Sequence, residues 1–352
     1  MTQVAAQPRR VRVLLVDDSE ASRSAVEGML AGRPGLQVVG HARDGEEALR
    51  AALRLAPDVI VLDLEMPRMD GFTFLRLLMA QHPTPVVVVS AQSRRSDVFK
   101  ALELGALDFV AKPEGRAPME EIRDVLVEKC ETLGALRGWN ARGAVAGTPE
   151  PAPARPVVEP ARVAVVGAST GGPQALKRLL ESLPGSAPLA LLVAQHMPER
   201  FTATFAERLG RTTSFSVREA EDGDVVAVGR VLVAPGGHHL TLRRDPLGVL
   251  RAAVVAHDGE RGRYCPSVDR LFASAAETLG PRAAAVVLTG MGNDGREGVR
   301  AVRAAGGLTL AEAEGSAVVY GMPLAAVETG AVAEVLALED LAPRLARFAR
   351  GE

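Results

Sequence analysis

VRVLLVDDSEASRSAVEGMLA, residues 11–31, is a short β-branched run followed by two aspartates and a helical pattern. A second unit of this kind begins with residues 162–182, RVAVVGASTGGPQALKRLLES, in which a serine follows the apolar run. Short apolar strands that alternate with amphipathic helices are typical of parallel sheets with crossover helices. The two stretches therefore predict α/β architecture in both halves of the chain.

The alternation continues along the chain. In the first half we expect strands at 11–16, 38–41, 59–62, 86–90 and 108–111, and helices near 20–31, 45–55, 71–80, 95–104 and 117–137. In the second half we expect strands at 163–167, 189–195, 231–234, 284–289 and 308–312, helices near 172–182, 200–209, 267–278, 296–305 and 322–327, and a hairpin over 240–257. The pattern predicts two doubly wound, mostly parallel α/β domains with their chemistry at the carboxyl ends of the strands.

Composition limits the class of function. Lys+Arg 41 against Asp+Glu 43 gives a net charge of -2, which provides no cationic field for nucleic acid or an anionic membrane. The apolar runs stay below the ~18 residues that a spanning helix needs, and the run at 11–16 is too short for a signal peptide. Two cysteines, Cys130 and Cys265, cannot form a disulfide framework or a structural zinc site alone. We expect a soluble, cytoplasmic protein that neither binds nucleic acid nor inserts into a membrane.

A change in composition marks the domain boundary. Residues 138–160, GWNARGAVAGTPEPAPARPVVEP, are rich in Pro, Gly and Ala and lack apolar periodicity, which predicts a semi-flexible linker. The expected organisation is a disordered tail at 1–10, one domain at 11–137 and a second at 161–350. Each domain is long enough to bury its own core.

Polar side chains end successive strands of the first half. Asp17 and Asp18 follow the first predicted strand and Asp63 follows the third, so their carboxylates meet at one edge of the sheet. Three carboxylates in one pocket repel each other unless a cation neutralises them, and Mg²⁺ suits an all-oxygen site. Ser90 and Lys112 end the next two strands and are suited to hold phosphoryl oxygens around an aspartyl phosphate.

Each of these residues also has an ordinary structural interpretation. The aspartates could cap helices or lie in loops, Ser90 could be a strand-end hydroxyl, and Lys112 could be a solvated lysine. Because all five stand at strand ends, the phosphate-accepting pocket is favoured. Phe109, three residues before Lys112, would be the ring that repacks when Ser90 turns toward the phosphoryl group.

Residues 11–135 resemble response-regulator receiver domains, on the motifs VDDS at 16–19, DLEMPRMDG at 63–71 and GALDFVAKP at 105–113, together with Ser90. The resemblance implies a flavodoxin-like (βα)5 fold and phosphorylation of Asp63 by a CheA-type histidine kinase. It also implies roles for the other residues of the pocket. Mg²⁺ would be ligated by Asp18, Asp63 and the Glu65 backbone carbonyl with the support of Asp17, and the phosphoryl group would be read by Ser90 and Lys112.

GASTGGP, residues 167–173, follows the first strand of the second half. As G-x-S-x-G it is a nucleophile elbow, in which small neighbours let Ser169 project from a tight turn. As a Gly-rich strand-to-helix turn it could instead cradle a phosphate at the helix N-terminus. A dinucleotide fingerprint needs glycine in place of Ser169 and an acidic residue at the end of the next strand. That strand ends in Gln195-His196, so the dinucleotide interpretation fails twice.

A nucleophilic serine needs a base, and an imidazole base needs an orienting carboxylate. His196 follows the strand expected beside the first, so its ring can reach Ser169. Asp294 lies in TGMGNDG, residues 289–295, at the same sheet edge, and the glycines permit turns that aim amide N–H groups at a developing oxyanion. The alternatives are helix-capping roles for Ser169 and Asp294 and a packed loop position for His196.

Four other residues compete for these roles. His238, His239 and His257 are second choices for the base, or contacts at the rim of the site. Cys265 is the rival nucleophile, although a single cysteine in apolar-flanked sequence is more often buried and inert.

The half from 162 to 348 is similar to the methylesterase domain of the CheB family of bacterial chemotaxis. The motifs GASTGGP, QHMP, AEDGD, APGGHH, PSVD, LTGMGNDG and GMP occur in the family's order. The resemblance implies a Ser169–His196–Asp294 triad with Thr170 and the Met291 amide on the oxyanion side. The implied reactions are hydrolysis of glutamyl methyl esters on chemoreceptors, with release of methanol, and deamidation of receptor glutamines. An esterase site covered by the unphosphorylated receiver is implied as well.

One segment departs from the family. Residues 260–265, ERGRYC, stand where the family usually has a basic residue after an Asn-Arg-like stretch, which puts substrate docking in doubt more than the chemistry. Two other functions remain open at this point. A DNA-binding response regulator would need a basic helix-turn-helix pattern that the second half lacks, and a receiver-controlled nonenzymatic binding protein would use Ser169 only as a cap.

Overall fold

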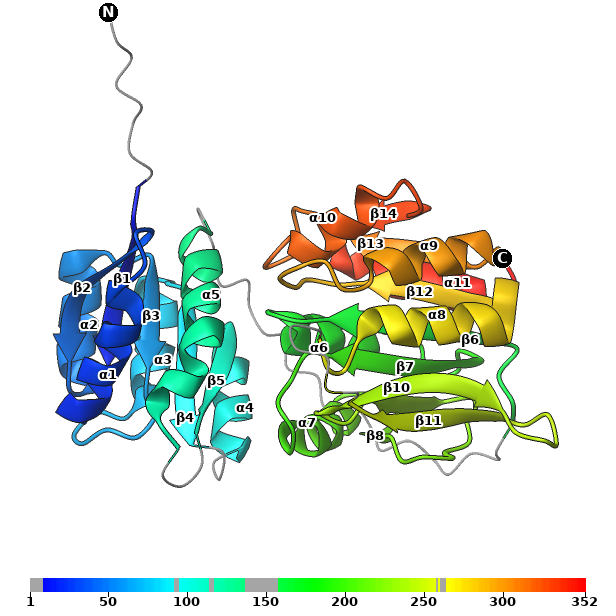
Figure 1. Ribbon diagram of the computed structural model, residues 1–352, viewed down its shortest axis with the longest axis horizontal. Helices are drawn as coiled ribbons and strands as arrows, with labels where there is room; N and C mark the ends of the chain where they lie inside the picture. Colours follow the sequence, from blue (N-terminus) through cyan, green and yellow to red (C-terminus); the bar gives the residue numbers. More distant parts are fainter. Residues whose placement is uncertain (1–8, 92–94, 114–116, 137–157, 258, 260–263) are drawn as a thin grey trace, which may run out of the picture. The chain divides into compact units, whose positions relative to one another are not determined.

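The computed structural model describes residues 9–91, 95–113, 117–136, 158–257, 259 and 264–352. The chain forms two compact units, residues 1–145 and 146–352 (Figure 1). The expected tail at 1–10 and linker at 138–160 lie almost wholly outside the described residues and remain predictions.

A five-stranded parallel sheet forms the first unit. Its strands are β1 (Val11–Val16), β2 (Leu36–Ala42), β3 (Val59–Leu62), β4 (Val86–Ala91) and β5 (Asp108–Lys112). Its helices are α1 (Glu20–Ala31), α2 (Gly45–Leu55), α3 (Gly71–Gln81), α4 (Arg95–Glu103), the 3₁₀ turn η2 (Met119–Ile122) and α5 (Arg123–Gly134). The strand order β2-β1-β3-β4-β5, parallel throughout, is that of flavodoxin-like folds and confirms the predicted fold.

Local sequence explains why these helices start where they do. Ser19, Asp44 and Asp70 are the N-caps of α1, α2 and α3, and each side chain accepts a backbone N–H of the first turn. The central strands β3 and β4 are buried on both faces, as near-continuous apolar runs require. The polar residues that follow them are therefore held at the carboxyl edge of a rigid sheet.

A seven-stranded parallel sheet and a separate antiparallel hairpin form the second unit. Its strands are β6 (Arg162–Ala168), β7 (Leu189–Gln195), β8 (Ser216–Glu219), β9 (Arg230–Val233), β10 (His238–Arg244), β11 (Leu250–Ala256), β12 (Ala283–Val287), β13 (Leu308–Glu312) and β14 (Glu334–Leu336). Its helices are α6 (Gly172–Ser182), α7 (Phe201–Gly210), α8 (Val268–Leu279), the 3₁₀ turn η3 (Gly280–Arg282), α9 (Arg296–Ala304), α10 (Gly321–Val327) and α11 (Leu338–Arg350).

The strand order β14-β13-β12-β6-β7-β9-β8 puts β6 at the point where the connections reverse direction. β6 pairs with β7 on one side and with β12 on the other, in parallel both times. Ligands of open α/β sheets bind at such a switch point, outside the carboxyl ends of the strands. The loops after β6, β7 and β12 contain Ser169, His196 and Asp294.

Several elements differ from the sequence-based expectations. The first-half helix expected near 117–137 is a 3₁₀ turn followed by α5, and the expected strand at 284–289 ends at Val287. The hairpin was expected over 240–257 and is formed by β10 and β11 around a turn at Asp245, whose N–H and carbonyl bond Val249 and Gly248. The short edge strands β8 and β14 and the helix α11 were not expected.

Among the described residues, no helix combines the length and the apolarity that crossing a bilayer requires.

Candidate active site

The serine turn and the histidine loop leave the sheet side by side. Ala168 pairs with Gln195 in the β6–β7 register, so Ser169 and His196 are the next residues on neighbouring strands. The His196 N–H donates to the Ala168 carbonyl at 3.0 Å. The turn into α6 is tight because Gly171 takes a φ of +78°, which favours glycine. Ser169 is half-buried there, and within the described part of the chain its Oγ makes no hydrogen bond.

His196 and Asp294 form a hydrogen-bonded pair. Nε2 of His196 lies 2.9 Å from Oδ2 of Asp294, and the two side chains are 13% and 2% exposed. Because a carboxylate only accepts hydrogen bonds, the proton of the neutral imidazole is on Nε2 and the lone pair is on Nδ1. Asp294 therefore holds the ring in the tautomer in which Nδ1 can act as a base.

Asp294 is itself fixed by the start of α8. Its carboxylate accepts the N–H groups of Val268 at 2.8 Å and Asp269 at 2.9 Å, and the hydroxyl of Ser267 at 3.2 Å. Burial alone would raise the pKa of Asp294, but the hydrogen bond and charge of His196 and these N–H groups hold it below its ordinary value. The carboxylate stays ionised and immobile beside the ring.

The residues expected on the oxyanion side, Thr170 and Met291, are both buried. A Cβ on Gly290 would lie 2.8 Å from Cβ of Ser169, so the loop after β12 packs directly on the serine. Within the described residues the Met291 N–H donates to no acceptor, so this amide can bind a ligand oxygen. The arrangement fits the donor of an oxyanion site.

Thr289 ties these loops together, a role that the sequence analysis missed. Its carbonyl accepts the Ser169 N–H at 3.0 Å, and its Oγ1 donates to the Thr170 carbonyl at 2.9 Å. Its Oγ1 also accepts the Val319 N–H at 2.8 Å, while its own N–H donates to Glu312 at 2.8 Å. The available signal in the sequence was a threonine directly after the apolar run AAAVVL, and in the structure Thr289 is fully buried.

Gln195 and Tyr264 were also missed. Gln195 is buried, and its Nε2 donates to the carbonyls of Ser169 at 2.9 Å and His196 at 3.1 Å. The Tyr264 ring is stacked on the His196 ring, with centroids 4.5 Å apart and an interplanar angle of 4°. For Gln195, the available signal in the sequence was its position at the end of the apolar strand LALLVAQ. No local pattern pointed to Tyr264, because its partner lies 68 positions away in the chain.

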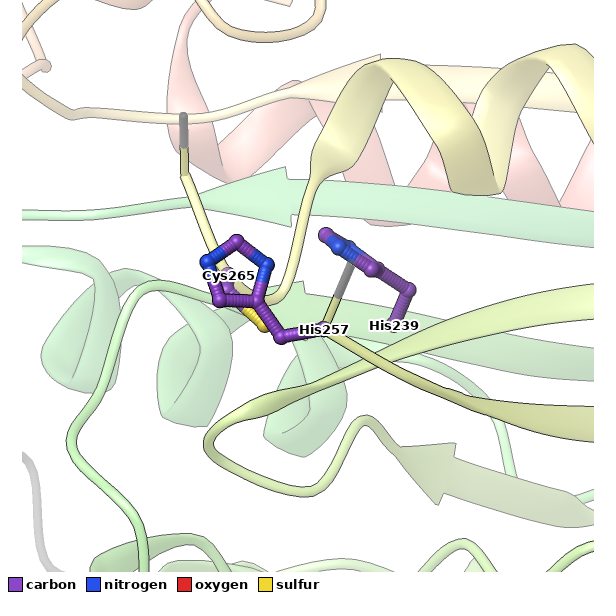
Figure 2. A group of neighbouring side chains, drawn as sticks. All are labelled: His239, His257 and Cys265. Atoms are coloured by element: carbon purple, nitrogen blue, oxygen red, sulfur yellow. The ribbon is translucent and has the colours of Figure 1, made fainter. Parts of the chain in front are cut away.

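The competing residues form a group of their own. Figure 2 shows His239, His257 and Cys265 together, with ligand-type atoms within 4.8 Å of one another. Nδ1 of His239 accepts the Ser267 N–H at 3.1 Å, which places the proton of the neutral ring on Nε2. While this bond exists the His239 ring has no lone pair for a metal ion, unlike ligating histidines, which donate from their second nitrogen. The imidazole partner of Asp294 is His196, not one of the second choices.

In the first unit, the acidic pocket lies at the carboxyl ends of β1 and β3. The Lys112 ammonium contacts the Asp63 carboxylate and lies 3.3 Å from Oδ2 of Asp17. Asp17 also accepts the hydroxyl of Ser22 at 2.6 Å. Asp18 and Glu65 are exposed on the flanking loops, and the Glu65 N–H donates to Asp63 at 3.2 Å.

Lys112 lies beside two carboxylates of this pocket, and the charges of the three groups affect one another. Burial raises the pKa of Asp63, and its contact with Lys112 offsets this only in part, while the charge of Asp17 raises it further. Burial would lower the pKa of Lys112, but the hydrogen bond and charge of Asp63 and the charge of Asp17 raise it above its ordinary value. Asp17 and Asp63 line one small cavity. Carboxylate oxygens whose mutual repulsion Lys112 relieves only in part fit a Mg²⁺ ion.

The remaining predicted residues of this pocket stand on the neighbouring strands. Ser90 is buried and pairs with Ala111 in the β4–β5 register, next to the pairing of Ala91 with Lys112. Phe109 is buried and packs edge-to-face on Phe99, with centroids 6.5 Å apart.

These geometries define a class of protein. A receiver-type α/β unit with an acidic pocket is followed by a second, mostly parallel α/β unit that has a serine and a histidine–aspartate pair at one sheet edge. The family model for the response regulator receiver domain matches residues 13–124, and that for CheB methylesterase matches residues 164–345. The chain belongs to the CheB methylesterase family, whose members in chemotaxis signalling couple a receiver to an esterase.

The proteins that this chain resembles match it over nearly their whole length. Protein-glutamate methylesterase/protein-glutamine glutaminase 6 of Anaeromyxobacter dehalogenans (strain 2CP-C) is 65% identical over 344 residues, 97% of each chain. The corresponding enzyme 3 of Geobacter sulfurreducens is 47% identical over 357 residues, 95% of this chain and 96% of that one. The crystal structure of the Thermotoga maritima CheB methylesterase catalytic domain is 38% identical, with a TM-score of 0.51, and covers 53% of this chain and 97% of its own.

Proposed function

We propose that this chain hydrolyses glutamyl methyl esters on chemoreceptors, deamidates certain receptor glutamines, and is activated by phosphorylation of Asp63. The observation that carries the proposal is the hydrogen bond between His196 and Asp294 at the strand end next to Ser169. The names of the relatives supply the reaction, and the receiver match supplies the control.

Ser169 is the nucleophile. As its Oγ attacks the ester carbonyl, the proton passes to Nδ1 of His196, the nitrogen that Asp294 leaves with its lone pair. Asp294 then stabilises the imidazolium, and the buried N–H groups that fix the carboxylate keep it from rotating. Thr170 and the Met291 amide act on the oxyanion of the tetrahedral intermediate, where one donor is worth about 10²–10³ in kcat.

The imidazolium returns its proton to the leaving group. Methanol leaves from a methyl ester, and ammonia leaves from a glutamine. A water molecule then attacks the acyl-enzyme with His196 as its base, which releases the glutamate and restores the Ser169 hydroxyl. General acid–base help of this kind is typically worth ~10²–10⁴-fold.

Asp63 is the phosphoacceptor in the first unit. A histidine kinase of the CheA type is the phosphodonor, and Lys112 and Ser90 hold the oxygens of the incoming phosphoryl group. Mg²⁺, held by Asp17, Asp18, Asp63 and the Glu65 carbonyl, would neutralise the carboxylates and the phosphoryl oxygens when bound. Phe109 repacks as Ser90 turns toward the phosphoryl group. The receptor substrate and the kinase are cytoplasmic-side partners, so a cytoplasmic location follows from the proposal.

Methanol release from a methylated receptor, with and without a small-molecule phosphodonor, tests the proposal. The native chain should release methanol, and the phosphodonor should increase the rate. Ser169→Ala should release none while still accepting phosphate on Asp63, and Ser186→Ala, which changes an exposed serine of the same unit, should behave like the native chain. Turnover retained by Ser169→Ala refutes the assignment.

A further inference from the structure

We propose that Tyr264 is a positioning residue of the esterase, which holds the His196 imidazole in plane and favours its protonated state during acyl transfer. The inference rests on the proposed triad. It starts from the stacked pair, in which the two ring centroids are 4.5 Å apart and the rings are 4° from parallel.

Asp294 alone does not fix the histidine ring. Its one hydrogen bond to Nε2 holds the edge of the imidazole but permits rotation about the axis of that bond. The Tyr264 ring covers one face of the imidazole and blocks this rotation. The carboxylate and the tyrosine together therefore restrain both the edge and the plane of the base, which keeps the direction of Nδ1 constant.

The far side of Tyr264 is anchored on the oxyanion loop. A Cβ on Gly292 would lie 1.9 Å from the Tyr264 hydroxyl and 2.9 Å from Cζ, so the phenol packs against the bare Cα of this glycine. Gly292 has a φ of +79° and follows Met291, whose amide is the proposed oxyanion donor. Tyr264 thus joins the base to the loop that carries the donor.

The same short segment also supports the carboxylate. Ser267, three residues after Tyr264, donates to Oδ1 of Asp294 at 3.2 Å, and its N–H donates to His239. The segment from Tyr264 to Ser267 therefore contacts both members of the histidine–aspartate pair. Tyr264 itself belongs to residues 260–265, where the sequence departs from its family, and the stack assigns this residue a role in the chemistry.

The stack acts differently on the two states of the base. The face of an aromatic ring carries negative potential, which attracts a cation placed over it. The His196 ring becomes a cation when it takes the serine proton and returns to neutral when it releases that proton. The tyrosine face thus stabilises the imidazolium, which resembles the transition state, more than it stabilises the neutral imidazole of the ground state. Its effect therefore falls on kcat rather than on KM.

The test compares Tyr264→Phe, Tyr264→Leu and Tyr264→Met in the full chain, with methanol release from methylated receptor as the readout. Phe keeps the ring and should retain kcat within about threefold, whereas Leu and Met remove it and should lower kcat by roughly 3- to 30-fold with KM unchanged. Met has a long, adaptable side chain and serves if Leu does not fold, as judged by the melting temperature.

A second readout reports the ring directly. The Nε2 proton of His196, followed by NMR in the native chain and Tyr264→Phe, should carry the ring-current shift of the stack, and Tyr264→Leu should lose it. Unchanged kcat in folded Tyr264→Leu and Tyr264→Met, a loss in Tyr264→Phe as large as in Leu, or an effect confined to KM would each overturn the inference. If Ser169→Ala stayed active the triad itself would fail, whereas an inactive Ser169→Ala with a fully active Tyr264→Leu would refute only the role of Tyr264.

Discussion

Asp294 combines a structural and a chemical task in one carboxylate. It accepts hydrogen bonds from His196, from two backbone N–H groups at the start of α8 and from the hydroxyl of Ser267. From the sequence alone, Asp294 could either cap a helix or take part in catalysis. The side chain is placed for both, although the helix that it supports is α8 and not the adjacent α9. The long-range contact to α8 could not be predicted, because it depends on two segments separated by 26 positions.

Asp294→Asn should separate the two tasks. The two α8 amides bond to different oxygens of Asp294, so asparagine keeps an acceptor for only one of them, and it cannot stabilise an imidazolium. We expect kcat for methanol release to fall by about 10³–10⁴, with a much smaller effect on folding, seen as a moderate decrease in melting temperature. Asp269→Asn is the matched control, because Asp269 is a neighbouring half-buried carboxyl that accepts the Gly298 N–H, whereas the carboxylate hydrogen-bonded to the His196 ring is that of Asp294. Equal losses in the two variants would assign Asp294 to folding alone.

Glu312 is a buried acid whose titration should affect stability. Burial raises the pKa of Glu312 from 4.5 to about 7. Between these pH values the folded chain binds a proton that the unfolded chain lacks, so the free energy of unfolding should decrease as the pH rises, by about 3 kcal/mol at most.

Glu312→Gln should remove this dependence while keeping an acceptor for the Thr289 N–H. We expect its thermal unfolding to vary little between pH 5 and pH 8 and to occur at a higher temperature than that of the native chain at pH 8. Glu314→Gln changes an exposed acid two residues away and should leave the native dependence intact. Parallel pH curves for the native chain and Glu312→Gln would contradict the account.

At the level of secondary structure, the loop after β12 packs tightly against the serine turn. A Cβ on Gly290 would lie 2.4 Å from Sδ of Met322, 2.8 Å from Cβ of Ser169 and 3.0 Å from the Ser169 amide. The methionine end can move, but the serine backbone cannot. A side chain at this position must push the loop after β12 and the backbone of Ser169 apart.

We therefore expect Gly290→Ala to lower kcat by about 10- to 100-fold, because displacements of about 1 Å at reacting groups cost that much. Its melting temperature should fall only modestly. Gly315→Ala, where the added Cβ meets nothing within 4 Å, should have native kinetics. Native turnover by Gly290→Ala would show that the loop is not held against the serine.

The strands that carry the site were predictable, and some peripheral elements were not. β6, β7 and β12 are apolar runs that end in polar or glycine-rich turns, which gives both the strand and the position of its functional end. β8 and β14 are short edge strands of four and three residues without apolar alternation. α11 does have apolar residues at helical spacing, but Pro343 inside it is a signal that normally ends a helix.

Control of the esterase by the receiver involves the chain as a unit. In the proposed control, phosphorylation of Asp63 raises the esterase rate only to the extent that the phosphoryl group favours one arrangement of the chain over another. A coupling free energy of ~1–3 kcal/mol corresponds to roughly 5- to 150-fold. If the unphosphorylated receiver restrains the esterase, deletion of residues 1–155 should raise the basal rate of methanol release and abolish the response to a phosphodonor.

Asp63→Asn in the full chain provides the complementary variant. It should keep the low basal rate and should not respond to the phosphodonor, because the acceptor carboxylate is gone. A folded fragment with the basal rate of the full chain, or a lower one, would count against restraint by the receiver. A phosphodonor response in Asp63→Asn would place the phosphoacceptor elsewhere.

The most direct measurement of the central claim is the position of covalent labelling by a serine-directed acylating probe, read by peptide mass spectrometry on the full chain. The account predicts a single label on Ser169 that disappears in Ser169→Ala and forms far more slowly in His196→Ala. A label on Cys265, or labelling of Ser169 at the native rate without the imidazole, would contradict it.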